Sequence, residues 1–416
     1  MTDTPDRPDY DGPPPWTKVG RHGMFPEADH DEIARFNFLA GLNRHMAGAV
    51  APGVAMAYEK RVRPAFEKEH GRPPETRHEV RRAMAQDTYY QTWSSLRRST
   101  MEMRQENGRT VVLRQRHALA DKAAELNADK PTLTLNPDLK IPPYLTAVDH
   151  HCMPGSYYTE LFDGDVAAAA NYDSGLFVTT QGLLGKFSDG GGTAVVAWLT
   201  KEYPDFKPKR ILDLGCGLGH NTLPLGQAFP DAEIIAVDVA APMLRYGHAR
   251  AQSLGVTNVH FLQADAESLD FEDASFDFII TAQFWHETSA KAFTKVMADI
   301  HRMLKPGGLA LHLEQPQYQG MDPFEAFMRD WDAYYNNEPF WTTMHDIDLV
   351  RATEDAGFAP GSYFETAVAA QLDPDLFPAQ PAEEGTEEDY GRKPAWTCFG
   401  AWKQAQTSSK TVEAAE

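Results

Sequence analysis

The segment "ILDLGCGLGH" at residues 211–220 constrains the fold of this 416-residue chain more than any other stretch. An apolar run ends in an acidic residue, and three glycines then alternate with other residues. A strand that ends in such a loop brings bare backbone close to a ligand, because glycine has no Cβ to hold the ligand away. The segment therefore predicts a buried strand followed by a ligand-binding turn.

The region after Lys209 alternates short β-rich runs with helical runs. Such alternation predicts an α/β fold, in which helices cover both faces of a parallel sheet and ligands bind beyond the carboxyl ends of the strands. The glycine loop lies at this edge. We expect strands at 210–214, 234–239, 259–264, 277–282 and 309–314, and helices near 220–229, 242–254 and 290–304.

The region before this sheet has a helical pattern from about residue 29 to 127. One helix is expected to begin after Thr76, which has capping-box spacing to Glu79, and to end at Asn107 and Gly108. The expected organisation is a disordered acidic, proline-rich tail at 1–28, a helical subdomain at 29–130, a linker and cofactor-covering segment at 131–190, the ligand-binding domain at 191–405 and a frayed tail at 406–416.

Charge and composition narrow the choice of partners. A net charge of −21 argues against a general affinity for nucleic acid. The three cysteines have neither metal-site nor disulfide spacing, which suits a reducing compartment. Apolar runs of membrane-spanning length are absent from the sequence. We therefore expect a cytoplasmic protein with no nucleic acid and no membrane as partner.

The glycine loop does not fit a dinucleotide. A dinucleotide fold places glycines at G-x-G-x-x-G, and the third position is occupied here by His220. The glycines are instead Gly215, Gly217 and Gly219, and they follow Asp213. A carboxylate there is unfavourable beside a diphosphate but favourable beside a cationic group. The loop therefore predicts a ligand with a cationic end.

Two further acids follow the next strands. Asp238 ends the second strand, where a carboxylate usually accepts hydrogen bonds from both hydroxyls of a ribose. Asp265 ends the third, where it can accept one from the amine of adenine. Together with the loop, these acids describe a positively charged nucleoside without phosphates. S-adenosyl-L-methionine fits that description.

These motifs resemble those of class I S-adenosylmethionine-dependent methyltransferases, over roughly residues 190–405. "ILDLGCGLG" looks like their first motif, "IIAVDVAAPML" like the ribose motif and "FLQADAESL" like the adenine motif. "HRMLKPGGLALHLE" is typical of small-molecule members related to quinone-ring methyltransferases. The resemblance implies a Rossmann-like, doubly wound sheet of seven strands, with an antiparallel last strand at Trp396–Trp402. The expected cofactor-binding residues are Asp213, Gly215, Gly217, Gly219, Asp238, Met243, Asp265, Ala266 and Gln283.

His286 is the residue expected to act on the acceptor. In plant-type small-molecule O-methyltransferases the matching segment carries a histidine base followed by an acid, and His286 and Glu287 stand at the same distance from Asp277. This favours O-methylation of a small molecule with His286 as the base. Substrate positioning or a structural role for His286 stays open. So do C- or N-methylation, another transfer from the same nucleoside, and a regulatory protein that binds it without turnover.

The segment "DHHCMPGSYYTELFDG" at residues 149–164 could bind a ligand. Metal binding through His150, His151 and Cys152 is disfavoured, because neighbouring histidines rarely face one centre and no fourth ligand is evident. No metal is therefore predicted. Tyr157 and Tyr158 either contact the cofactor or acceptor or belong to the core.

An insertion at residues 318–346 is rich in aromatic residues. They either pack against the N-terminal helices or form a hydrophobic lid over the acceptor. The helices themselves are expected to build a pocket wall, a homodimer interface or both.

Overall fold

The structure, a computed structural model, describes residues 12–377 and 395–405. These residues are arranged around an eight-stranded sheet. Its order is β1-β4-β3-β2-β5-β6-β8-β7. The strands are β1 (Leu133–Thr134), β2 (Arg210–Leu214), β3 (Glu233–Asp238), β4 (Val259–Gln263), β5 (Phe276–Ala282), β6 (Leu304–Leu313), β7 (Tyr363–Ala369) and β8 (Ala395–Trp402).

Strand direction confirms the predicted fold class. Strands β1 to β6 pair in parallel, whereas β8 runs antiparallel to both β6 and β7. This is a Rossmann-like sheet with an antiparallel last strand. The predicted number of seven strands is wrong, because β1 pairs along the outer edge of β4, with Leu133 opposite Phe261. Two residues within a proline-rich segment are too few to give a strand pattern.

Alternate residues of the strands point to opposite faces, and each face is buried under helices. Ile211 and Ile234 belong to a core with α8 (Gly190–Glu202), α9 (Thr222–Ala228) and α10 (Ala241–Ser253). Leu212 and Ile235 belong to a second core with α11 (Ala290–Met303) and α15 (Leu349–Asp355). The sheet is therefore doubly wound, as predicted.

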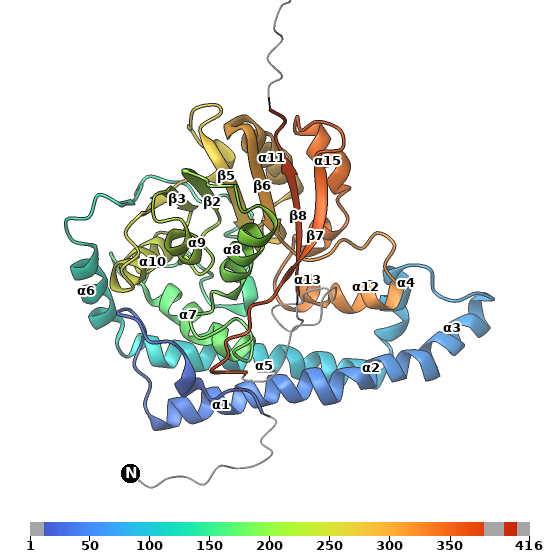
Figure 1. Cartoon of the computed structure of the whole chain (residues 1–416). Helices are drawn as coiled ribbons and strands as arrows, with labels where there is room; N and C mark the ends of the chain where they lie inside the picture. Colours follow the sequence, from blue (N-terminus) through green and yellow to red (C-terminus); the bar gives the residue numbers. More distant parts are fainter. Residues whose placement is uncertain (1–11, 378–394, 406–416) are drawn as a thin grey trace, which may run out of the picture.

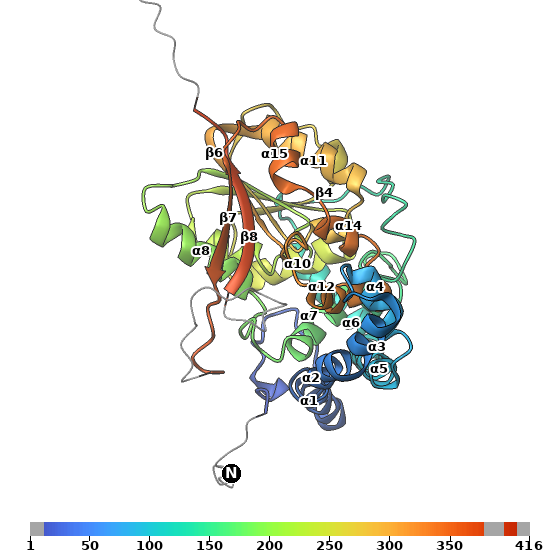
Figure 2. The same cartoon turned by 90° about the vertical axis from the view of Figure 1, so that its right-hand side faces the viewer.

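The N-terminal region forms a helical layer, in which α1 and α2 run beside the long α5 and α3 extends beyond them (Figures 1 and 2). No described helix has the length and apolar character needed to span a bilayer. The helices are α1 (His30–His45), α2 (Ala51–Ala57), α3 (Arg63–His70), α4 (Arg77–Met84), α5 (Thr88–Leu113), α6 (Arg116–Asn127) and α7 (Ala167–Thr179), and the π-helical turns η2 (Met46–Val50) and η3 (Tyr58–Val62) join α1, α2 and α3.

The prediction that a helix ends at Asn107 and Gly108 is wrong, because α5 continues to Leu113. A Cβ at Gly108 would lie 2.0 Å from Oδ1 of Asn171, so this glycine permits close packing of α5 on α7. The side chain of Asn107 accepts a hydrogen bond from Nε of Arg35 at 2.7 Å. Both residues therefore act in helix packing and not in helix termination.

The prediction of a disordered tail is wrong for residues 12–28, because this segment packs on the helical layer. Trp16, Met24 and Phe25 are buried, and Nε1 of Trp16 donates to the carbonyl oxygen of Ser174 at 3.0 Å. Residues 1–11 and the predicted frayed tail at 406–416 lie outside the described part of the chain.

The aromatic insertion forms three short helices, α12 (Pro323–Arg329), α13 (Trp331–Tyr335) and α14 (Trp341–His345). Phe327 and Trp331 are buried against Tyr90 and Trp93 of α5. Trp341, by contrast, lines the large cavity described below. The insertion therefore both packs against the helical layer and forms part of the cavity wall.

Candidate active site

A cavity of about 720 Å³ lies where the carboxyl ends of β2, β3, β4 and β5 meet the N-terminal helices. Loops that follow these four strands form one side of it, and residues of α1, α5, α7, the segment 142–158 and the insertion form much of the rest. This volume falls within the range of small-molecule sites. The cavity is therefore a candidate site for a small ligand.

Gly215 and Gly217 line the cavity with φ angles of 72° and 53°. A Cβ at Gly217 would meet no atom within 4 Å, so the backbone there is open to a ligand. Gly219 is not among the lining residues, and a Cβ at this position would lie 3.1 Å from the ring of Phe261. The loop thus presents two of its three glycines to the cavity.

Asp238 lines the cavity, as predicted from its position at the end of β3. Its two oxygens accept hydrogen bonds from the backbone N–H groups of Gly217 and Ala240, both at 2.9 Å. Burial raises the pKa of this carboxyl, although these backbone donors oppose the shift. The carboxylate therefore also braces the glycine loop from the neighbouring strand.

Asp213 is not among the cavity-lining residues. It is buried, and one carboxylate oxygen accepts a hydrogen bond from Oγ1 of Thr222 at 2.5 Å. Burial raises the pKa of Asp213 to about 7, against the effect of this hydrogen bond. The structure thus places Asp213 in contact with the start of α9 and outside the cavity lining. Its contact with the methionyl end of a cofactor stays a prediction.

The remaining predicted cofactor residues, Met243, Asp265, Ala266 and Gln283, all line the cavity. Oδ1 of Asp265 accepts from the backbone N–H of Glu267 at 2.9 Å, which leaves Oδ2 without a protein partner in the hydrogen bonds of the described residues. Gln283 has a φ of 54°, and its buried Nε2 has no hydrogen-bond partner among the described residues. These two side chains therefore offer an acceptor and a donor to a ligand.

His286 is buried in the cavity wall on the short helix η6 (Trp285–Glu287). Its Nδ1 lies 2.6 Å from Oε1 of Glu314, and its Nε2 lies 3.6 Å from Oε2 of Glu338. Burial lowers the pKa of His286, but Glu314, Glu338 and Glu287 more than offset this, so the pKa rises to about 9. The raised pKa favours the protonated imidazole, and a protonated imidazole cannot accept a further proton.

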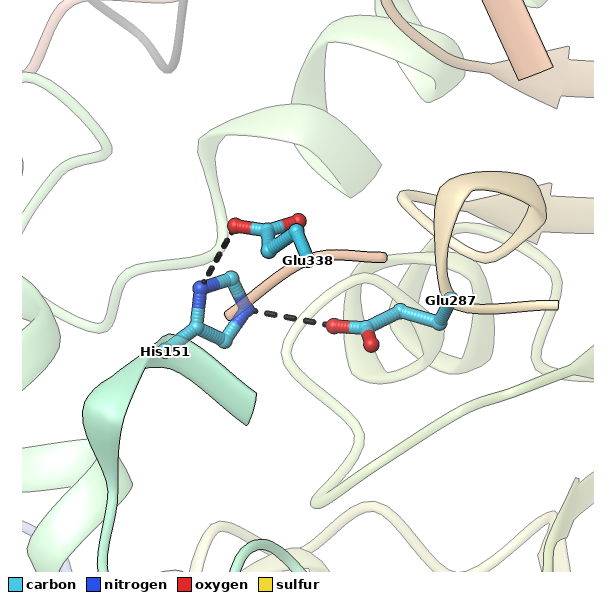
Figure 3. Close-up of side chains that lie close together, drawn as sticks. All are labelled: His151, Glu287 and Glu338. Atoms are coloured by element: carbon cyan, nitrogen blue, oxygen red, sulfur yellow. Dashed lines mark ion pairs between the residues drawn. The ribbon is translucent and has the colours of Figure 1, made fainter. Parts of the chain in front are cut away.

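Glu287 follows His286 in the sequence, and its side chain faces the two histidines of η4 (His150–Cys152). Its two carboxylate oxygens lie 3.2 Å from Nε2 of His150 and 3.2 Å from Nε2 of His151. On the other side of the His151 ring, Nδ1 lies 2.9 Å from Oε1 of Glu338 (Figure 3). One carboxylate thus faces two histidines that are adjacent in the sequence.

The expectation that adjacent histidines would not face one centre is wrong, because His151 has a φ of 51°. This left-handed conformation turns the chain so that both imidazoles reach Glu287. Cys152 does not join them, since its Sγ lies 3.8 Å from the carbonyl oxygen of Tyr335.

Sequence reasoning missed Glu314 and Glu338. Glu314 directly follows β6. An acidic residue just after a strand was the signal that predicted site residues at the ends of β3 and β4, and the same signal could have found Glu314. Glu338 stands in the insertion, and nothing in its local sequence marks it.

Two tyrosines and an arginine complete this part of the wall. Tyr157 and Tyr158 both line the cavity, and the hydroxyl of Tyr157 donates to Oε1 of Glu287 at 3.1 Å. Arg104 is buried on α5 and donates through Nε to Oγ1 of Thr179 at 3.0 Å. Its Nη1 has no hydrogen-bond partner among the described residues, and burial lowers its pKa. A buried guanidinium of this kind favours an anionic ligand.

Comparison with known proteins agrees with this arrangement. Residues 211–308 match a family profile described as a methyltransferase domain. This chain contains a class I methyltransferase domain. The methyltransferase domain is 40% identical over 109 residues to a demethylmenaquinone methyltransferase of Thermus thermophilus, covering 26% of this chain and 48% of that protein. A protein of the same name from Symbiobacterium thermophilum is 29% identical over 244 residues, covering 56% of this chain and 86% of that protein.

This chain spans about half the length of several curated relatives that it matches, among them the protein from Thermus thermophilus. Among solved structures, phosphoethanolamine N-methyltransferase 2 of Haemonchus contortus shows a TM-score of 0.40 at 18% identity, covering 56% of this chain and 57% of that chain. The profile match confirms the resemblance drawn from the motifs.

The cavity of the methyltransferase domain fits S-adenosyl-L-methionine, the cofactor of this class. Open backbone at Gly217 permits close approach of the ligand, and Asp238 and Asp265 offer carboxylate oxygens. The unpaired Nη1 of Arg104 fits the carboxylate of an amino acid end.

Proposed function

We propose that this protein transfers the methyl group of S-adenosyl-L-methionine to a ring carbon of a small hydroxylated acceptor. The observation that carries the proposal is that one cavity holds both the Gly217–Asp238 pair and the His286 cluster. The cofactor supplies a methyl group made electrophilic by its sulfonium. The choice of carbon over the initially expected oxygen is supported by relatives named as demethylmenaquinone methyltransferases and as ubiquinone/menaquinone biosynthesis C-methyltransferases.

A hydroxylated ring explains why ionisable groups line the acceptor side. Loss of the hydroxyl proton to water spreads negative charge over the oxygen and the adjacent ring carbons. A ring carbon can then form a bond to the methyl carbon while the bond from methyl to sulfur breaks and S-adenosylhomocysteine leaves. The proton on that ring carbon passes to water when the aromatic ring is restored. We propose that His286, held protonated by Glu314, donates a hydrogen bond from Nε2 to the acceptor oxygen and stabilises that charge. Its role is then electrostatic positioning, in place of the base function first expected.

Cofactor contacts are proposed on the other side of the cavity. Asp238 accepts hydrogen bonds from the ribose hydroxyls, and Asp265 accepts one from the adenine amine. Gly217 provides the open backbone between them. Asp213, which lies outside the cavity lining, is assigned a supporting role through Thr222 at the start of α9.

Changing His286 to alanine should lower kcat by roughly 10²- to 10³-fold with nearly unchanged cofactor affinity, because a preorganised donor near the reacting oxygen is lost. Steady-state turnover and calorimetric titration with S-adenosylmethionine measure the two quantities. His260 on β4 provides a control, since it does not line the cavity and pairs with Thr134. Full activity in the His286 variant would remove this residue from the mechanism.

Changing Arg104 to methionine should weaken S-adenosylmethionine binding by roughly 10- to 100-fold, because a charged hydrogen bond to the carboxylate of the methionyl end is worth about 1.5–3 kcal/mol. The lysine variant is the matched control and should retain part of the affinity. Calorimetry with the cofactor alone makes the measurement. If cofactor affinity stays constant while the KM for the acceptor rises, the anion belongs to the acceptor instead.

The proposed function is tested with S-adenosylmethionine and a panel of hydroxylated aromatic acceptors that includes a reduced demethylated quinone. Mass spectrometry should find product heavier by one methylene unit, and carbon NMR should place the new methyl group on carbon. A methoxy signal would assign the reaction to oxygen. Cofactor binding without any product across the panel would favour a regulatory protein, and a different mass increment would indicate another transfer.

A further inference from the structure

The cluster formed by His151, Glu287 and Glu338 lies in the same cavity region as His286, yet hydrogen bonding alone does not account for its geometry. Nε2 of His150, Oε2 of Glu287 and Oε2 of Glu338 are buried and have no hydrogen-bond partner among the described residues. His150 and Glu338 are each at most 1% exposed. Their nearest partners are ionic contacts, between Nε2 of His150 and Oε2 of Glu287 at 3.2 Å and between Oε2 of Glu338 and Nε2 of His286 at 3.6 Å. Burying charged groups without well-formed hydrogen bonds is costly.

Two distances around Glu287 match those between neighbouring ligands of one metal ion, whereas Glu338 faces the other nitrogen of the His151 ring. Nitrogen and oxygen ligands bind such ions at about 2.0–2.2 Å, which places neighbouring ligand atoms roughly 3.0–3.4 Å apart, with their lone pairs directed at the ion and not at each other. Oε2 of Glu287 and Nε2 of His150 lie 3.2 Å apart without forming a hydrogen bond, and Oε1 of Glu287 and Nε2 of His151 are also 3.2 Å apart.

One atom from each of His151, Glu287 and Glu338 can be chosen so that all three lie within 4.8 Å of one another. Figure 3 shows the imidazole of His151 between the two carboxylates, which come from η6 and from the insertion. An ion that binds all three would draw the outer ligand atoms together by roughly 1–2 Å. Rotation of the Glu338 side chain, whose Oε2 accepts no hydrogen bond from the described residues, can supply such a movement.

We propose that His151, Glu287 and Glu338 bind a divalent first-row transition metal ion, with His150 as an additional nitrogen ligand. One imidazole together with two carboxylates suits Mn²⁺, Fe²⁺ or Zn²⁺ better than Mg²⁺, which prefers oxygen ligands alone. Two negative carboxylates balance the charge of such an ion. Tyr157 donates to Glu287 and orients that carboxylate from behind.

The position of the ion suggests its use. It would lie among residues of the cavity wall, close to His286. If the protein methylates a hydroxylated acceptor, as proposed above, the ion would bind the acceptor oxygen and favour its deprotonated form. The metal site itself is argued from the cluster geometry and does not depend on that reaction.

The test measures metal binding by full-length protein after removal of metal with a chelator, without cofactor or acceptor. Mn²⁺ is titrated while its free concentration is followed by electron paramagnetic resonance, and Zn²⁺ is titrated by calorimetry. We expect one ion per chain with a dissociation constant in the micromolar range or below. The thermal unfolding midpoint of the unmutated protein should rise with Mn²⁺ concentration, a measurement that requires no variant.

Glu287→Gln and Glu338→Gln should each weaken metal binding by about 10- to 100-fold or more, because each removes a charged ligand at nearly constant volume. Glu325→Gln is the matched control. Glu325 also lines the cavity but pairs with Arg329 outside the cluster, so its variant should bind the ion like the unmutated protein.

The proposal is overturned if the unmutated protein binds neither ion, or if the Glu287, Glu338 and Glu325 variants bind equally well. The cluster would then be a network of histidine and glutamate ion pairs. Because the assay contains no methyl donor, its result is independent of whether the proposed function is correct. A fall in activity on chelation, reversed by Mn²⁺, would separately establish that the ion acts in catalysis.

Discussion

Changing Asp238 to alanine is expected to weaken S-adenosylmethionine binding by at least roughly 100-fold. Each carboxylate oxygen can accept more than one hydrogen bond, so Asp238 can bind two ribose hydroxyls while it accepts the N–H groups of Gly217 and Ala240. Two hydrogen bonds to a charged group are together worth about 3–6 kcal/mol. The variant also loses the bond that braces the loop at Gly217, which adds to the effect.

Calorimetric titration with S-adenosylmethionine makes this measurement, and circular dichroism checks that the fold is retained. Glu233→Ala is the control, since Glu233 begins the same strand and its carboxylate pairs with Arg210 at the other end of β3. Unchanged affinity in the Asp238 variant would refute the ribose assignment.

The largest effect on stability is expected at Asp173 of α7. This buried carboxylate lies 2.8 Å from Nε2 of His22 and 2.8 Å from Nε2 of His220, and it accepts a hydrogen bond from the hydroxyl of Tyr246 at 2.7 Å. Alanine would leave all three groups buried without their partner. We expect a loss of about 3–5 kcal/mol in the free energy of unfolding, the usual range for breaking a buried ionic contact.

Chemical denaturation and thermal unfolding measure this loss, and Asp205→Ala, a change at an exposed acid, is the control. The pH dependence has a defined sign. Burial raises the pKa of Asp173, but His22 and His220 outweigh burial and hold it well below its usual range. The stabilisation is therefore present above the unfolded pKa of about 3.9 and is lost as the pH falls toward the lowered folded value. An unfolding midpoint close to that of the unmutated protein would contradict this account.

Local patterns predicted the central sheet well. Strands β2 to β6 and helices α9, α10 and α11 occur close to their expected positions, because apolar periodicity and glycine loops act over short distances along the chain. The positions of Asp238 and Asp265 in the cavity wall were also predicted well, because residues at the carboxyl end of a parallel strand lie at the edge of the sheet where the cavity is. These elements required no knowledge of distant contacts.

The features that sequence reasoning missed depend on distant contacts or on unusual backbone conformations. The length of α5 follows from its close packing on α7 at Gly108, which reads locally as a helix stop. Glu338 meets His151 only because the insertion folds back over the cavity. The position of His151 itself requires a left-handed backbone, which residues other than glycine seldom adopt. The burial of Trp16 was missed for a similar reason, because the proline-rich sequence around it contains no pattern that indicates packing against distant residues.

The short strand β1 has a mechanical consequence. Phe261 of β4 donates its backbone N–H to the carbonyl oxygen of Thr132 at 2.8 Å. The segment that follows the N-terminal helices is therefore hydrogen-bonded to the edge of the sheet. The chain then passes through η4 and α7 before it enters β2. The histidines of η4 are thereby connected to the sheet through β1, whereas the carboxylates that face them, Glu287 and Glu338, lie on η6 and in the insertion. Loss of the β1–β4 pairing should therefore first change the distances between these histidines and the two carboxylates.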